Sequence, residues 1–340
     1  MNTITKNKGK RDQTWDIVKG IGIVLVVIGH SGCPTYLKHF IYLFHMGLFF
    51  FISGMFISTP NINNLWHFIK IRLKRLYIPF ATAGIILVLL HNFLFSIGWN
   101  IESYDLSQLI KKLIGTLIFK DIEPQLLPLW FLKSLFFSSI IVYIILCINK
   151  IQIQIGIIIT LYTFGWICSY THNHLFFSLE RECVVSAVIY MGYLLKNKIT
   201  ILYKYGILCL CILLISAPYI WIGLAVTDIS FYSAFPLYSL IGIIGITFIA
   251  KTLIKTNIGS IMAKLGLNSL EILIIHYPAM QILSQILVST GLQSHSVLWQ
   301  TPTIDSLKGT WWWIPYTLCG LGLSLIYIFI KNKIKSIYKK

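Results

Sequence analysis

Charged residues are scarce in this sequence: only 11% of its 340 residues are Asp, Glu, Lys or Arg, whereas 56% are hydrophobic. Soluble domains of ordinary composition contain about 25% charged residues. No long polar stretch interrupts the apolar runs, which leaves no place for a second, soluble domain. The composition predicts an all-α polytopic membrane protein, because helices satisfy their backbone hydrogen bonds internally within lipid.

Motifs typical of several catalytic and metal sites are also missing. The seven cysteines are odd in number and include no Cys-x-x-Cys pair, which argues against a disulfide framework and a zinc site. The sequence has no P-loop, no His-Glu-x-x-His and no Gly-x-Ser-x-Gly motif. His172 and His174 are two potential metal ligands, but a metal site needs at least a third. We therefore expect no bound metal.

Ten apolar runs are long enough, or nearly long enough, to span a bilayer. The run at 183–195 is short by about five residues and could be tilted, broken or re-entrant. The first run contains Asp16, Lys19 and His30 and lacks a good cleavage site, so we interpret it as a retained helix rather than a signal peptide. The predicted spans are 15–32, 36–58, 77–98, 128–148, 151–170, 183–195, 203–224, 230–250, 267–290 and 311–331.

The net charge of +17 would suggest a nucleic-acid partner in a soluble protein, but here its distribution follows the predicted topology. With the N-terminus in the cytoplasm, the inner segments contain 20 Lys and Arg residues and the outer segments contain seven, as the positive-inside rule requires. This predicts cytoplasmic termini, with basic tails at 1–14 and 332–340 around one transmembrane domain at 15–331. Membrane lipids are expected partners, and nucleic acid is not.

The first run, WDIVKGIGIVLVVIGHS at 15–31, combines apolar residues with ionisable ones. Lys19 and His30 are eleven residues apart, about three helical turns and about 16 Å, so both should point the same way. Lys19 can extend to the headgroups and pair with Asp16. His30 should lie near the middle of the bilayer, where a histidine marks a functional site or makes a hydrogen bond between packed helices.

The sequence DIVKGIGIVLVVIGH, followed by FIYLFHMGLFFFISGMFI, resembles the start of the acyltransferase 3 family, the integral-membrane acyltransferases that modify sugars. The resemblance is closest to the fucose 4-O-acetylase-like branch. The family's hallmark is a basic residue, ten intervening residues and a histidine, here Lys19 and His30. Most members have arginine at the first position, so Lys19 is a departure that loses the bidentate guanidinium fork.

The segment IKIRLKRLYIPF resembles the family's Arg-x-x-Arg motif at Arg72 and Arg75. These residues are one turn apart at a predicted cytoplasmic helix end, where they could bind phosphates. They could instead supply only positive-inside charge and contacts to anionic lipids. The resemblance implies that Arg72 and Arg75, together with Lys19, bind the phosphates of a coenzyme A thioester.

Four further positions match weaker motifs of the family. His45 could hold the tautomer of His30 through a hydrogen bond, or it could be a packed core histidine. The family usually has Met-Pro after this histidine, whereas this chain has Gly47 in place of the proline; Gly47 and Gly54 should let helices approach closely. The matched residues are His45 in FHMGLFFFISG, Trp130 in LPLWFLKSLFF, and Ser269 and His276 in GLNSLEILIIHYP.

The resemblance implies an O-acetyltransferase of the bacterial inner membrane. Acetyl-CoA would bind at the cytoplasmic face, and the acceptor would be a sugar hydroxyl of a surface polysaccharide or lipid-linked glycan. His30 would act as a general base or take the acetyl group covalently. Two other classes fit the same sequence: a glycan or small-solute exporter, and a sensory or assembly component that binds a glycan without turnover. The oligomeric state is open.

Overall fold

The computed structural model describes residues 12–58, 60–171, 178–222 and 232–337, and within these ranges the chain is helical without β-strands. The all-α polytopic class predicted from the composition is therefore confirmed. The helices are α1 (Thr14–His30), α2 (Thr35–Tyr42), α3 (His45–Met55), α4 (Leu65–Arg72), α5 (Ile78–Ser96), α6 (Leu106–Leu117), α7 (Trp130–Leu146), α8 (Ile151–Tyr170), α9 (Leu179–Leu195), α10 (Ile199–Leu202), α11 (Gly206–Ser216), α12 (Phe235–Leu253), α13 (Asn257–Leu267), α14 (Ser269–Ser289) and α15 (Trp313–Ile337).

Eight helical segments in the described residues are long and apolar enough to cross a bilayer, and each overlaps one of the predicted spans. The two remaining predicted spans correspond to α1 and α9, which are helices of 17 residues each. Seventeen residues lie at the lower end of the range for a transmembrane helix. The count of ten spans stays a prediction. Residues 1–11 of the predicted tail at 1–14, residues 338–340 of the predicted tail at 332–340 and the His172–His174 pair lie outside the described residues.

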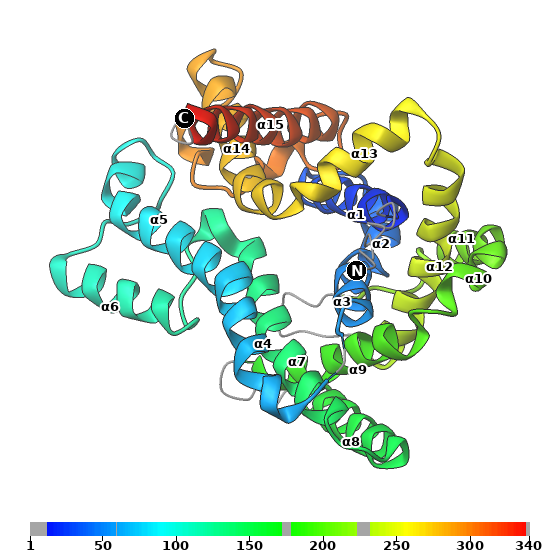
Figure 1. Cartoon of the computed structure of the whole chain (residues 1–340). Coiled ribbons are helices and arrows are strands. Elements are labelled where there is room, and N and C mark those ends of the chain that lie inside the picture. Colours follow the sequence, from blue (N-terminus) through cyan, green and yellow to red (C-terminus); the bar gives the residue numbers. More distant parts are fainter. Residues whose placement is uncertain (1–11, 59, 172–177, 223–231, 338–340) are drawn as a thin grey trace.

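Helices α1 and α3 lie near the centre of the bundle, and the other helices surround them (Figure 1). Glycines allow the central helices to approach their neighbours closely. A methyl group at Gly20 of α1 would collide with the backbone of Met262 in α13. Gly47 and Gly54 of α3 likewise face Ser239 of α12 and the backbone of Ile189 in α9, which confirms the predicted close packing at both positions.

The second predicted span is interrupted between α2 and α3. The backbone leaves the helical conformation at Phe44, whose φ is −143°. The imidazole Nδ1 of His45 contacts the carbonyl oxygen of Ile41 at 2.8 Å, and this carbonyl is the one that the His45 backbone N–H would use in an unbroken helix. The side chain of His45 therefore replaces its backbone N–H as a partner of the Ile41 carbonyl at the point where the helix breaks.

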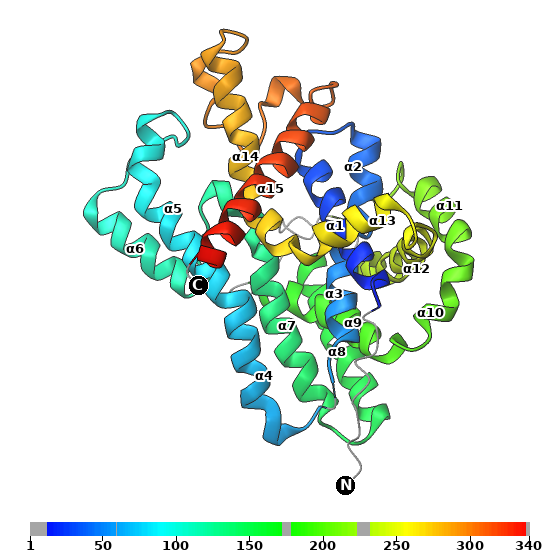
Figure 2. The same ribbon diagram turned by 45° about the horizontal axis from the view of Figure 1, so that its top comes forward.

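The third span begins earlier than predicted, because one continuous helical segment runs from Ile62 to Ser96 (Figure 2). Arg72 and Arg75 were expected at the end of a cytoplasmic loop, but both lie within this segment. Residues Leu73–Tyr77 form a π-helical turn directly before Pro79. Proline cannot donate a hydrogen bond to the carbonyl four residues earlier, and a π-turn accommodates such an interruption without ending the helix.

The predicted polar loop at 100–127 contains α6, which packs on α5 where Thr116 contacts Gly84. Asp105 and Gln108 form a capping box at its first turn. The sequence analysis missed this helix because its apolar residues recur only over three turns and are broken by lysines. The exposed apolar side of α6 consists of Leu106, Ile110, Ile114 and Leu117.

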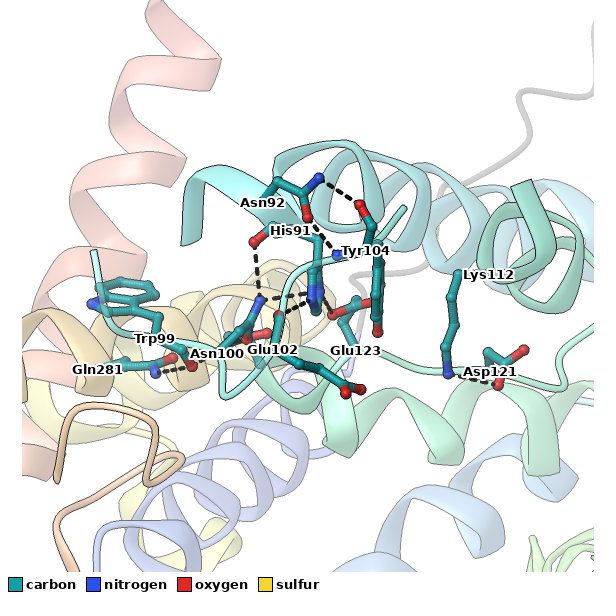
Figure 3. A network of polar contacts seen from close by, with 11 residues as sticks. His91, Asn92, Trp99, Asn100, Glu102, Tyr104, Lys112, Asp121, Glu123 and Gln281 are labelled. Carbon is teal, nitrogen blue, oxygen red and sulfur yellow. Dashed lines mark hydrogen bonds and ion pairs between the residues drawn. The ribbon is translucent and has the colours of Figure 1, made fainter. Parts of the chain in front are cut away.

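A buried polar network holds the segment before α7 against α5 (Figure 3). His91 Nδ1 pairs with Glu123 Oε2 at 2.9 Å, Asn100 Nδ2 donates to the carbonyl oxygen of His91 at 3.2 Å, and Gln125 Nε2 donates to Asn100 Oδ1 at 2.8 Å. Burial and the neighbouring Glu123 raise the pKa of Tyr104, so its hydroxyl stays protonated and donates to Glu123 Oε1. This network fixes the start of α7, on which Trp130 lies.

The predicted short span at 183–195 is longer in the structure, because α9 begins at Leu179. The predicted span leaves out Glu180, Arg181 and Glu182, but all three are buried in the first turn of α9. Buried charges are stable in such a place when they are paired and hydrogen-bonded.

The start of α1 and the end of α15 lie at the same end of the bundle. Gly266 packs on the backbone of Asp16 in α1, and five residues further on Glu271 pairs with Lys331 of α15 at 2.7 Å. This pair joins the start of α14 to the last two turns of α15. That this end faces the cytoplasm stays a prediction from the charge distribution.

Candidate active site

One stripe along α1 lines two adjoining cavities. Lys19, Ile23, Val26 and His30 follow one another at intervals of four, three and four residues, and such residues share a helix face. Lys19 lines the first cavity and His30 the second. Lys19 and His30 therefore lie on the same side of α1, as their spacing predicts.

The first cavity, which we call the basic cavity, has a volume of about 490 Å³. It brings together Lys19 of α1, Arg72 and Arg75 of the third span and Ser269 of α14, all of which the sequence analysis selected. Lys19 Nζ pairs with Asp16 at 2.9 Å, as predicted. All three cations were expected to hold the phosphates of coenzyme A, and they line one cavity although they come from helices that are distant in sequence.

Arg72 is the cation with the most unusual environment in the basic cavity. Its guanidinium lies over the ring of Phe68, with Cζ 4.7 Å from the ring centroid. Its Nε atom is buried and has no hydrogen-bond partner among the described residues. A buried guanidinium donor without a protein acceptor is costly unless a ligand supplies the acceptor. An anionic group in the cavity would satisfy it.

A further cavity, which we call the rim cavity, adjoins the basic cavity. It has a volume of about 590 Å³ and shares Ile71, Arg75 and Leu270 with the basic cavity. Its charged lining consists of Lys74, Arg75, Glu271 and Lys331. The two cavities together form a largely basic entrance between the third span and α14.

The second cavity on the α1 stripe, which we call the histidine cavity, is much smaller, with a volume of about 30 Å³. His30, His45, Tyr42 and Trp130 line it. Among the residues that the structure describes, none that lines this cavity is a lysine or an arginine.

The tautomer of His30 is set by His276. The Nδ1 atom of His276 lies 2.9 Å from the carbonyl oxygen of Ile272, which can only accept, so a neutral His276 carries its proton there. Its Nε2 atom is then an acceptor, 3.1 Å from His30 Nδ1, which donates. The proton of His30 is thus on Nδ1, and its Nε2 atom has a free lone pair for proton abstraction or nucleophilic attack.

His45 does not make the contact with His30 that was proposed as one of its two roles. Its Nδ1 atom bonds to Ile41, whereas the hydrogen-bond partner of His30 is His276. The His30 ring stacks on His276, with centroids 5.3 Å apart, and meets the edge of Tyr277 at 5.0 Å. His45 is buried and lines the same cavity as His30, so it remains close to any group that reacts there.

The charged residues at the start of α9 support Trp130 from behind. Arg181 lies over the Trp130 ring at 4.7 Å, and Arg181 Nη2 contacts Glu182 Oε1 at 3.5 Å. Ser134 Oγ donates to the same carboxylate at 3.0 Å, and Ser138 Oγ donates to its other oxygen at 3.3 Å. The sequence analysis missed this cluster, although two serines one turn apart in a predicted span indicate a polar helix face.

The fold and the two cavities define a class: a polytopic membrane protein in which a cationic cavity adjoins a smaller cavity lined by His30, whose partner His276 is buried. The family model of the acyltransferase 3 family, described as an acyltransferase domain, matches residues 12–329. The chain belongs to this family and is a membrane acyltransferase. Comparison of this chain with curated proteins and with solved structures found no match. Among the described residues, no group of three or more His, Cys, Asp or Glu side chains could hold a metal ion.

Proposed function

We propose that this protein is an O-acetyltransferase that moves an acetyl group from cytoplasmic acetyl-CoA to a hydroxyl of a sugar. The acceptor is a surface polysaccharide or lipid-linked glycan, as expected for the fucose 4-O-acetylase-like branch, and the membrane is the bacterial inner membrane. The observation that carries this proposal is the meeting of Lys19, Arg72 and Arg75 in one cavity that adjoins the cavity of His30.

The basic cavity suits the phosphate end of coenzyme A. Its volume of about 490 Å³ falls within the range of small-molecule sites. Coenzyme A has a pyrophosphate and a 3′-phosphate, and Arg72, Arg75 and Lys19 supply three cations for these groups. The unsatisfied Nε of Arg72 gains an acceptor when a phosphate enters. The rim cavity, with Lys74 and Lys331, leaves space for the remainder of the nucleotide.

The pantetheine arm then extends along the α1 stripe toward His30. Lys19 and His30 are separated by about 16 Å of helical rise, a distance that an extended arm can bridge. The apolar residues Ile23 and Val26 of α1 lie between them and line the basic cavity. An apolar passage excludes water, which would otherwise compete with the acceptor hydroxyl.

At the histidine cavity the reaction has two possible courses. In the first, His30 Nε2 removes the proton of the acceptor hydroxyl, a carbon–oxygen bond forms at the thioester carbonyl, and the carbon–sulfur bond breaks. The proton finally protonates the coenzyme A thiolate. In the second, Nε2 attacks the thioester carbonyl and the carbon–sulfur bond breaks to release the coenzyme A thiolate; the acceptor hydroxyl then takes the acetyl group from Nε2, and its proton goes to the thiolate. In either course His276 positions the lone pair of His30 without contacting the acetyl group.

The proposed function is tested by comparing surface glycans from cells with and without this protein. Mass spectrometry should detect acetyl esters, each adding 42 Da, that disappear on deletion and return with the wild-type chain. Cells carrying His30→Ala should lack the same esters. Identical glycan spectra in the deletion strain and the wild type would contradict the proposal.

A further inference from the structure

Three apolar side chains separate the basic cavity from the histidine cavity. Val26 of α1, Met46 of α3 and Leu273 of α14 line both cavities. Their exposed fractions are 2%, 7% and 6%, so they are packed closely against their neighbours. An acyl group that travels from the basic cavity to His30 must pass between these side chains, which we call the constriction.

The space beyond the constriction is small. A cavity needs about 10–15 Å³ of space accessible to the centre of a water-sized sphere to hold one water molecule. The histidine cavity, with about 30 Å³, therefore has room for two to three water-sized groups. An acetyl group has three non-hydrogen atoms, whereas a butyryl group has five. The remaining lining includes the rings of Tyr42, Pro128 and Trp130, which are rigid and cannot change shape to enlarge the cavity.

From this geometry we infer that Val26, Met46 and Leu273 select the length of the transferred acyl chain and restrict it to two carbons. This inference rests on the proposed function and adds the substrate class of the donor to it. Met46 is the mobile member of the constriction, because its unbranched thioether side chain adapts to neighbouring groups. When it moves aside the thioester can approach His30, and Val26 and Leu273, which also line the small cavity beyond, leave no room there for an acyl chain longer than two carbons.

The acyl chain is selected at the proposed transfer step, in which the thioester carbon–sulfur bond breaks and an ester carbon–oxygen bond forms. A longer acyl chain would still enter the basic cavity with its coenzyme, because that cavity is about 490 Å³. Chain length should therefore affect turnover more than coenzyme binding. Each misfit methylene group in a tight apolar pocket costs about 10-fold or more in specificity.

The test uses inverted membrane vesicles from the native cells, which expose the cytoplasmic face and contain the natural acceptor. Acetyl-, propionyl- and butyryl-CoA are supplied separately, and free coenzyme A is measured by chromatography after subtraction of vesicles from deletion cells. The wild type should use acetyl-CoA at least about tenfold better than butyryl-CoA, expressed as kcat/KM. Leu273→Ala, which removes three carbons from the constriction, should lower this ratio by about tenfold or more.

Leu270→Ala is the matched control. Leu270 is one turn from Leu273 on the same helix and lines the basic and rim cavities but not the histidine cavity, so this variant should keep the wild-type ratio. The ratio does not depend on the amount of folded protein, and the milder Leu273→Val should shift it in the same direction. A wild type that uses butyryl-CoA as well as acetyl-CoA would overturn the inference while leaving the acyltransferase intact. Absence of coenzyme A release from every thioester would instead overturn the proposed function and the inference together.

Discussion

The basic cavity and the histidine cavity adjoin each other yet differ in almost every property. One has about 490 Å³ and is lined by Lys19, Arg72 and Arg75; the other has about 30 Å³ and is lined by two histidines and aromatic rings. A wide charged space can hold a large anionic ligand, and a small uncharged one restricts what can react. Under the proposed function, coenzyme binding and chemistry are separated along one helix face, so substitutions should affect them independently.

Apart from replacement of His30 itself, the largest effect on acetyl transfer is expected from loss of the contact that orients His30. His276→Ala should lower acetyl transfer by at least about tenfold, because general-base catalysis contributes about 10²–10⁴-fold and depends on the correct tautomer. His276→Gln should retain more activity than His276→Ala, since the amide oxygen can accept the proton of His30 Nδ1. Both variants should bind acetyl-CoA like the wild type in a calorimetric titration. Equal activity of the alanine and glutamine variants would mean that His276 only fills space.

Substitutions in the basic cavity should weaken the binding of acetyl-CoA, which the His276 substitutions leave unchanged. The double substitution Arg72→Ala and Arg75→Ala should raise the Kd for acetyl-CoA by at least about tenfold, because a charge-assisted contact contributes about 1.5–3 kcal/mol. Calorimetry with purified protein measures this change. Lys70→Ala, which removes an exposed cation from the same helix outside all three cavities, is the matched control. If the double variant and this control bind alike, the arginines serve topology and lipid contact only.

The smallest effect is expected at the edge of the rim cavity. Lys331 pairs with Glu271 at 2.7 Å, but both side chains are about a quarter to a third exposed. Such pairs contribute less than about 1 kcal/mol to stability. Lys331→Ala should therefore shift the Tm in a thermal unfolding assay only slightly and should raise the Kd for acetyl-CoA less than the arginine substitutions. A loss of binding as large as that of the double variant would place the main phosphate site at the rim.

Much of this arrangement could be predicted from the sequence, because it depends on local periodicity. The spacing of Lys19 and His30 fixes their common helix face, and most apolar runs correspond to long helices. The meeting of Arg72 with Lys19, and of His30 with His276 across 246 residues, depends on how helices pack. Packing through Gly20 and Gly266 involves backbone contacts that periodicity does not report.

Two buried polar clusters were not predicted, and the physical reason is the same for both. Residues 180–182 and the segment before α7 lie outside the predicted spans because they are charged or polar. In the structure Glu182 is buried between two serines and Arg181, and Glu123 is buried beside His91. A polar side chain in an apolar chain can lie inside when specific partners satisfy it. Those partners come from other helices, so only the tertiary structure identifies them.

The central claim is that coenzyme binding and acetyl transfer occur at two separate places on one face of α1. It is tested most directly by His30→Ala in inverted vesicles supplied with radiolabelled acetyl-CoA. The account predicts that the wild type transfers label to the glycan fraction, and that His30→Ala transfers none while the purified variant binds acetyl-CoA with an unchanged Kd. A folded His30→Ala protein that transfers label at a near wild-type rate would contradict it, as would a wild type that moves solute across the membrane without cleaving the thioester.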